Sequence, residues 1–146
     1  MSLLNPGTNR VNCWIALMKL KVLVLSTLLS APVAAMAEPA LGTWLSPPDG
    51  KGQVGHVEVS KCGAALCGTL VRAYDSTGKP VITPNVGKRL IWNMVPQGNG
   101  AYDNGEVYVP AFGRNYDAEM RVAGNTLTVR GCLGPVCKNQ TWTRVR

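Results

Sequence analysis

Histidine, carboxylates and helical periodicity are all scarce in this sequence of 146 residues. There is one histidine, His56, and Asp and Glu together number 8. No G-x-S-x-G nucleophile motif occurs. Gly87-Lys88 is no P-loop either, because Ile82 stands where the upstream glycine belongs and Arg89 where the serine or threonine belongs. Without a nucleophile or a general-base constellation, we expect a protein that is not an enzyme and that uses no cofactor and no metal.

Long apolar runs are also missing, since a membrane-spanning helix needs about 20 apolar residues in succession. The longest run, residues 22–31, follows Lys19 and Lys21 and precedes the A-M-A sequence at 35–37. A basic start, a short apolar middle and an A-x-A end predict a cleavable secretory signal. We therefore expect no membrane span in the mature chain and a periplasmic or secreted location.

The domain boundary follows from that signal. Cleavage after Ala37 leaves residues 38–146 as a single domain, and residues 1–37 as an N-terminal extension plus signal peptide. Met18 would begin a signal of ordinary length, so residues 1–17 are expected to come from an upstream start codon. An extended basic region at the N-terminus is the alternative.

The positive charge of the mature chain is mild and scattered. Of 15 Lys and Arg residues, three precede residue 38, which leaves 12 against 8 Asp and Glu, a net charge of +4. The basic residues never form a run longer than two. Nucleic-acid binding needs a concentrated basic stripe, so we expect no nucleic-acid partner.

Four cysteines follow the cleavage site, in the two similar stretches KCGAALCG and GCLGPVCK. An even number of cysteines in a small exported chain indicates a disulfide framework. Of the three pairings, the spacing favours Cys62–Cys67 and Cys132–Cys137, each across a glycine-containing turn. Zinc and redox roles are the alternatives, but structural zinc sites usually use C-x(2–4)-C knuckles in reducing compartments, and redox pairs are usually C-x-x-C at a helix start.

Short alternating runs separated by turn residues predict an all-β domain. In residues 116–122, Tyr116, Ala118, Met120 and Val122 share one face, opposite Asp117, Glu119 and Arg121. We interpret the two carboxylates as a solvated charged surface rather than a catalytic pair. Asn104-Gly105 predicts a tight turn between GAYD and EVYV.

About eight short antiparallel strands can close into a small up-and-down β-barrel, which removes exposed sheet edges. An outer-membrane barrel is less compatible, because it needs strands of 9–11 residues with an apolar outer band. The expected outer faces here carry Asp, Glu and Arg. The fold class predicted is therefore all-β, as a soluble barrel.

Four stretches, GTWLS, CGAALCG, DNGEVYVPAFGRNYDAEM and LTVRGCLGPVCKNQTWTRV, together resemble the bacterial family known as domain of unknown function 2147. The resemblance covers nearly all of the mature chain. It implies an exported protein with a lipocalin-like (calycin) barrel. Family members commonly carry Asp between the Tyr and Pro of the Y-x-P step, whereas this chain has Val109, which removes any polar role there.

The resemblance also implies how one end of the barrel is closed. In lipocalins, the Trp of a G-x-W sequence on the first strand packs under an Arg from the last strand. Here the corresponding residues are Trp44 and Arg144. A guanidinium stacked on an indole contributes about 0.5–2 kcal/mol. This is a structural role.

Binding is the function that the remaining residues favour. Apolar cavities with a few polar tips are typical of small-ligand sites. The candidate ligand-binding residues are four that would line the barrel, Trp92, Tyr108, Tyr116 and Met120, and two in the loop VPAFGRNY, Phe112 and Arg114. The partner expected is a small apolar or amphipathic molecule. The alternative is a cell-envelope interaction protein whose barrel is filled by its own side chains and which acts through its loops.

Overall fold

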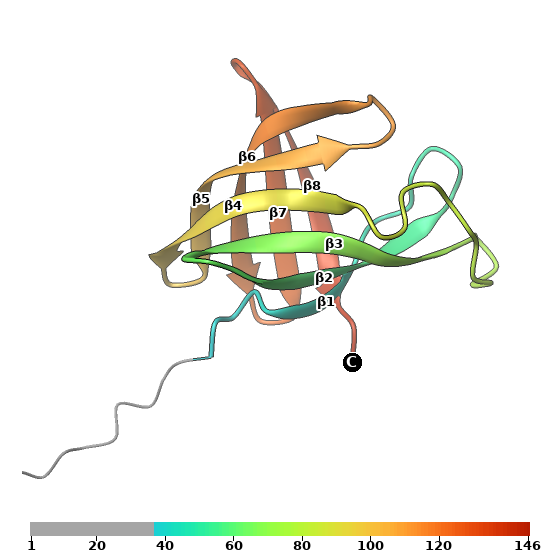
Figure 1. The fold of residues 1–146 in the computed structure, drawn as a ribbon, viewed down its shortest axis with the longest axis horizontal. Helices are drawn as coiled ribbons and strands as arrows, with labels where there is room; N and C mark the ends of the chain where they lie inside the picture. Colours follow the sequence, from blue (N-terminus) through green and yellow to red (C-terminus); the bar gives the residue numbers. More distant parts are fainter. Residues whose placement is uncertain (1–36) are drawn as a thin grey trace, which may run out of the picture. The chain divides into compact units, whose positions relative to one another are not determined.

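The computed structural model describes residues 37–146, which form one closed barrel of eight antiparallel strands joined in sequence order (Figure 1). The described part of the chain contains no helix, so no helix there could cross a membrane. The predicted all-β barrel is confirmed. The predicted signal peptide lies outside the described residues. The strands are β1 (Gly42–Leu45), β2 (Val54–Cys62), β3 (Ala65–Tyr74), β4 (Arg89–Gly98), β5 (Ala101–Val109), β6 (Arg114–Ala123), β7 (Thr126–Leu133) and β8 (Val136–Arg144).

Strand β6 has the predicted dry and wet faces. Ala118 and Met120 are buried, whereas Asp117 and Arg121 are exposed. Strand β7 continues the dry face, because Met120 pairs with Val129 across the two strands. Alternation of this kind around a closed sheet brings the apolar residues into one interior core.

The predicted turn at Asn104-Gly105 is wrong. Strand β5 runs through both residues, and its pairing with β6 shifts register between Tyr102 and Gly105. Asn104 takes a positive φ of 59°, so the turn-forming pair makes an irregularity inside a strand. The local turn signal is overridden because β4 and β6 hold β5 on both sides.

The interior of the barrel is filled by its own side chains. Met94 and Ile91 on β4 have no exposed surface, and Met120 is 3% exposed. A Cβ on Gly105 would lie 2.4 Å from the sulfur of Met94, and one on Gly68 would lie 3.1 Å from Ile91 Cδ1. These glycines therefore make room for larger side chains that cross the barrel from the neighbouring strands.

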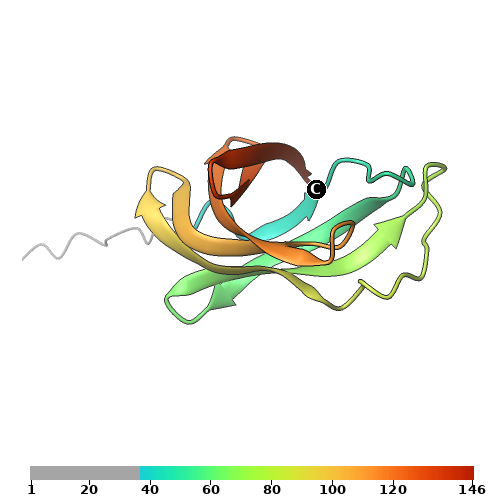
Figure 2. The same cartoon turned by 90° about the horizontal axis from the view of Figure 1, so that it is seen from above.

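The two ends of the barrel differ. At the closed end lie residues 38–41, the C-terminus and three tight turns, at 63–64, 99–100 and 124–125. The open end carries the loops 46–53, 75–88, 110–113 and 134–135, and the first two are the long connections on the right of Figures 1 and 2.

Trp44 anchors the closed end. Its side chain is fully buried, and its indole Nε1 donates a hydrogen bond of 2.8 Å to the carbonyl of Ala40. The guanidinium of Arg144 lies over the ring, 4.1 Å from its centroid. Arg144 also donates to the carbonyls of Leu41 at 2.9 Å and Pro39 at 2.6 Å. The pair thus ties the segment before β1 to the last strand.

Tyr102 holds the same segment from β5. Its hydroxyl donates to the carboxylate of Glu38 and accepts a hydrogen bond of 3.2 Å from the amide of Ala40. Burial, together with the hydrogen bond to Glu38, raises the pKa of Tyr102 above its ordinary value. The neutral phenol is therefore part of the closure.

Each disulfide closes the end of a hairpin. Cys62 is joined to Cys67 at the β2–β3 turn of the closed end, and Cys132 to Cys137 at the β7–β8 turn of the open end. This is the local pairing that the spacing favoured. Both bonds act as structural crosslinks within small loops.

Candidate functional site

Exposed apolar side chains collect at the open end of the barrel. Within residues 37–146, six large hydrophobic residues are exposed, and five of them lie in or beside the open-end loops; the sixth is Val95 on β4. Exposed apolar groups gathered in one region mark interaction surfaces more often than scattered ones do. The five are Ile82, Val86, Phe112, Leu133 and Val136.

Phe112 and Tyr116 form one side of this region. Phe112 is 64% exposed and lies in the 110–113 loop, where its amide and that of Gly113 donate to the carbonyl of Val109. Its ring meets that of Tyr116 edge-on, with centroids 6.3 Å apart. Tyr116 points inward and is partly buried against the core.

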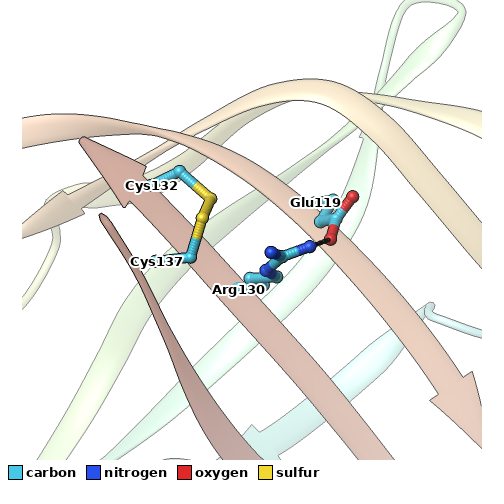
Figure 3. The surroundings of a disulfide bond; sticks show 4 residues. All are labelled: Glu119, Arg130, Cys132 and Cys137. Atoms are coloured by element: carbon cyan, nitrogen blue, oxygen red, sulfur yellow. Dashed lines mark hydrogen bonds and ion pairs between the residues drawn. A yellow bond between two sulfur atoms is a disulfide. The ribbon is translucent and has the colours of Figure 1, made fainter. Parts of the chain in front are cut away.

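The β7–β8 hairpin lies next to this side in the sheet, because Asp117 on β6 pairs with Cys132 on β7. Its disulfide lies on the outer face, beside Arg130 and Glu119 (Figure 3). Because neighbouring side chains alternate, the paired residues Leu133 and Val136 lie on the inner face. They are 52% and 65% exposed.

Gly131 on β7 lies next to Tyr116. A Cβ at this glycine would lie 3.5 Å from Cβ of Tyr116. Leu133 is the next inner-face residue after Gly131, so it stands just beyond the Tyr116 side chain. We call Phe112, Tyr116, Leu133 and Val136 the mouth cluster.

Two cations flank the mouth cluster on the same inner face. Arg114 pairs with Val109 and precedes Tyr116 by two residues. Lys138 pairs with Gly131 and follows Val136 by two residues. Both are exposed, and neither forms an ion pair, since the single ion pair of the described residues joins Arg130 to Glu119. The site can therefore offer apolar contact together with positive charge.

The lining residues predicted from the sequence are not all brought together. Trp92 pairs with Glu106 and Tyr108 pairs with Asn115, and Asn115 donates a hydrogen bond to Glu106 on the outer face. Paired residues share a face, so both aromatic side chains start on the outer face, and Tyr108 is partly buried and also packs against the core. Met120 lies inside, in the filled core.

Phe112, Arg114 and Tyr116 do meet at the mouth, but sequence reasoning missed Leu133, Val136 and Lys138. The signal was present in GCLGPVCK. If residues 134–135 form the loop of a hairpin and the cysteines at 132 and 137 point outward, alternation directs the side chains of residues 133 and 136 inward.

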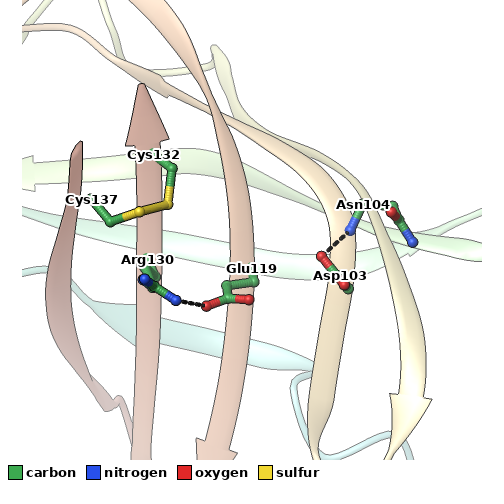
Figure 4. A network of polar contacts seen from close by, with 6 residues as sticks. All are labelled: Asp103, Asn104, Glu119, Arg130, Cys132 and Cys137. Atoms are coloured by element: carbon green, nitrogen blue, oxygen red, sulfur yellow. Dashed lines mark hydrogen bonds and ion pairs between the residues drawn. A yellow bond between two sulfur atoms is a disulfide. The ribbon is translucent and has the colours of Figure 1, made fainter. Parts of the chain in front are cut away.

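The outer face of β5 to β7 carries a polar depression of ≈ 370 Å³. Figure 4 shows part of it, with Asp103, Glu119 and Arg130 around the hollow. Arg130 donates to Glu119 at 2.7 Å, and both side chains are nearly half exposed. Asp117 lies on the same face, as the sequence predicted for a solvated charged surface. The polar depression is lined by Asp103, Asn104, Gly105, Glu106, Asp117, Ala118, Glu119, Arg130 and Cys132.

His56 is partly exposed and lies on β2, whereas the residues of the polar depression lie on β5 to β7. Its ring stands 4.8 Å from that of Tyr74, and it pairs across β2 and β3 with Arg72. Partial burial, together with the nearby Arg72 charge, lowers the pKa of His56. Within residues 37–146, no three His, Cys, Asp or Glu side chains are grouped so as to hold a metal ion.

Comparison with known proteins agrees with this architecture. The fold is that of the lipocalin-like barrels: a solved structure described as "Protein HP1028 from the human pathogen Helicobacter pylori belongs to the lipocalin family" superposes with a TM-score of 0.59 and 16% identity. The match covers 75% of this chain and 84% of that one. Residues 42–144 match the family described as "Uncharacterized protein conserved in bacteria (DUF2147)", and the chain belongs to that family. A search of curated proteins finds no match.

Proposed function

We propose that this protein is an exported, non-catalytic binding protein that holds an amphipathic anion at the open end of its barrel. The observation that carries the proposal is the mouth cluster, with exposed apolar side chains on two neighbouring elements of the open end, above a filled interior. The apolar part of the ligand would contact Phe112, Leu133 and Val136. Its anionic group would lie near Arg114 and Lys138.

The position of the ligand differs from that expected for a hollow barrel. Met94 and Ile91 fill the centre, and glycines on neighbouring strands accommodate them. A ligand at the mouth needs no rearrangement of this core. The disulfide Cys132–Cys137 supports the proposal in a second way, because it fixes the hairpin that presents Leu133 and Val136.

The test uses the fluorescent amphipathic anion 1-anilinonaphthalene-8-sulfonate, which brightens when it leaves water. Burying a leucine-sized side chain contributes about 1.5–3 kcal/mol, so Leu133→Asp should weaken binding by about tenfold or more. The matched control is Ile82→Asp, which changes a fully exposed apolar residue in a different open-end loop. Equal affinities for the two variants would contradict the proposal.

A second candidate function rests on Ile82 and Val86. Both are exposed in the 75–88 loop, outside the mouth cluster. They favour the alternative of a filled barrel that contacts a macromolecular partner of the cell envelope through its loops. In that case Ile82→Asp would abolish partner capture and leave probe binding unchanged.

A further inference from the structure

Strand β8 has an edge that the barrel leaves unpaired. It has nine residues, but its neighbour β1 has four, and the two strands pair only at Trp44 with Arg144 and at Leu45 with Thr143. Within residues 37–146, no other strand pairs with β8 on this side. Figure 4 shows β8 as the outermost strand at the level of Cys137, with β7 beside it.

The direction of each backbone group along this edge follows from two hydrogen bonds. The amide of Arg144 donates to Asn125 on the β7 side, and the amide of Val145 donates to Thr43 on the β1 side. Directions alternate along an antiparallel strand. The N–H and C=O groups of Cys137, Asn139 and Thr141 therefore point away from β7, toward the free edge.

The surroundings of these groups are open. Lys138, Asn139, Gln140 and Thr141 are all exposed. The disulfide of Cys137 projects from the outer face of the sheet rather than along its edge (Figures 3 and 4). The disulfide therefore does not stand between β8 and a strand that approaches in the plane of the sheet.

We propose that β8 is a dimerisation edge, at which a second copy of this chain adds its own β8 antiparallel about a two-fold axis through Asn139. In this register Asn139 faces Asn139 of the second copy, and Cys137 faces Thr141. Two facing residues whose backbone N–H and C=O groups are both free exchange two hydrogen bonds. Cys137, Asn139 and Thr141 of one copy each form such a pair with the second copy, so the interface has about six hydrogen bonds. The contact is the same patch on both copies, as a two-fold interface requires.

Charge is compatible with a second copy as the occupant, and it selects the register. Lys138 is the only charged residue in 136–141, and about an axis at Asn139 it faces the neutral Gln140 of the second copy. An axis at Lys138 would place two lysines directly opposite each other, which is destabilising. On the outer face beside Asn139, Arg130 already pairs with Glu119. No like charges therefore meet when this edge pairs with that of a second copy.

The first measurement is the mass of the native protein in solution by sedimentation equilibrium over a range of concentrations. We expect a reversible dimer. Asn139→Pro removes an edge N–H that forms no bond to β7, so it should leave the barrel intact and raise the dimer dissociation constant by about tenfold or more. Asn139→Ala keeps the N–H and is the matched control, which should dimerise like the native protein.

A charge-swap experiment tests the register and remains valid if the proline variant fails to fold. Asn139→Glu and Asn139→Lys should each be monomeric, because like charges would meet at the axis. A mixture of the two should form a heterodimer. A native protein that stays monomeric at all concentrations, or a dimer that the proline, glutamate and lysine variants leave unchanged, would overturn the proposal.

Discussion

Arg144 lies over Trp44 with its guanidinium carbon 4.1 Å from the ring centroid, and these residues are also paired across β8 and β1. The contact joins the first strand to the last, and two hydrogen bonds extend it to Pro39 and Leu41. One arginine therefore closes the sheet and holds the segment that covers its end.

Replacing this arginine should loosen the closed end. Arg144→Met keeps much of the side-chain stem but loses the cation over the indole and both hydrogen bonds, which should cost about 1–3 kcal/mol. Thermal unfolding should show a Tm lower by about 5 °C or more. Arg121→Met, at an exposed position on β6, is the control and should unfold like the native protein. Equal Tm values for the two variants would refute the structural role of Arg144.

Close packing of the interior predicts that Gly105→Ala is destabilising. Its Cβ would lie 2.4 Å from Met94 Sδ and 2.7 Å from the backbone oxygen of Trp92. Overpacking of a core typically costs about 1–3 kcal/mol, measurable by urea unfolding. Gly50→Ala is the matched control, because a Cβ there meets no atom within 4 Å and its φ is not positive. A neutral Gly105→Ala would indicate an interior with spare volume.

The two disulfides should differ in their effect on binding. Replacing either cysteine pair by alanine removes the constraint on a small loop, with an expected loss of about 2 kcal/mol. Only the Cys132–Cys137 pair lies beside Leu133 and Val136. The variant that lacks it should therefore bind the anionic probe more weakly, whereas the variant without Cys62–Cys67 should bind normally. If both variants bind equally well, the hairpin takes no part in the site.

His56 should titrate below its ordinary value of 6.5, because partial burial and Arg72 disfavour its charged form. The unfolded state then binds more protons than the folded state between the two pKa values, so stability falls as pH decreases through that window. The single histidine gives an unambiguous NMR titration. Arg72→Gln should raise the midpoint, and an unchanged midpoint would show that the Arg72 charge has no influence.

The sequence was sufficient for the strand pattern but not for side-chain direction at irregular positions. The alternation in residues 116–122 fixed the faces of β6 correctly, because each apolar residue there stands between polar ones. Trp92 and Tyr108 lie in strands where apolar residues occupy both faces, so alternation could not orient them. Their outward direction follows from pairing with Glu106 and Asn115, which are distant in the chain or across a loop.

Long-range contacts were the second kind of feature that could not be predicted from the sequence. The hydrogen bond from Tyr102 to Glu38 and the one from the Ala40 amide to Tyr102 each span more than 60 residues, and no local pattern predicts them. The free edge of β8 arises because β1 ends at Leu45, after four residues. Since a strand end depends on where its neighbours stop pairing, the sequence did not indicate this edge. The sequence predicted part of the mouth cluster, Phe112 and Tyr116, and one of its flanking cations, Arg114.

We propose that the ligand lies at the mouth of a filled barrel. NMR with labelled methionine methyl groups and backbone amides distinguishes this position from one inside the barrel. Met94 and Met120 are both buried in the interior and report on it alone. On addition of 1-anilinonaphthalene-8-sulfonate, we predict shifts in the amides of residues 111–116, 131–134 and 136–138, with both methyl signals unchanged. Large shifts of the Met94 and Met120 methyls, with the mouth amides unmoved, would instead place the ligand inside the barrel.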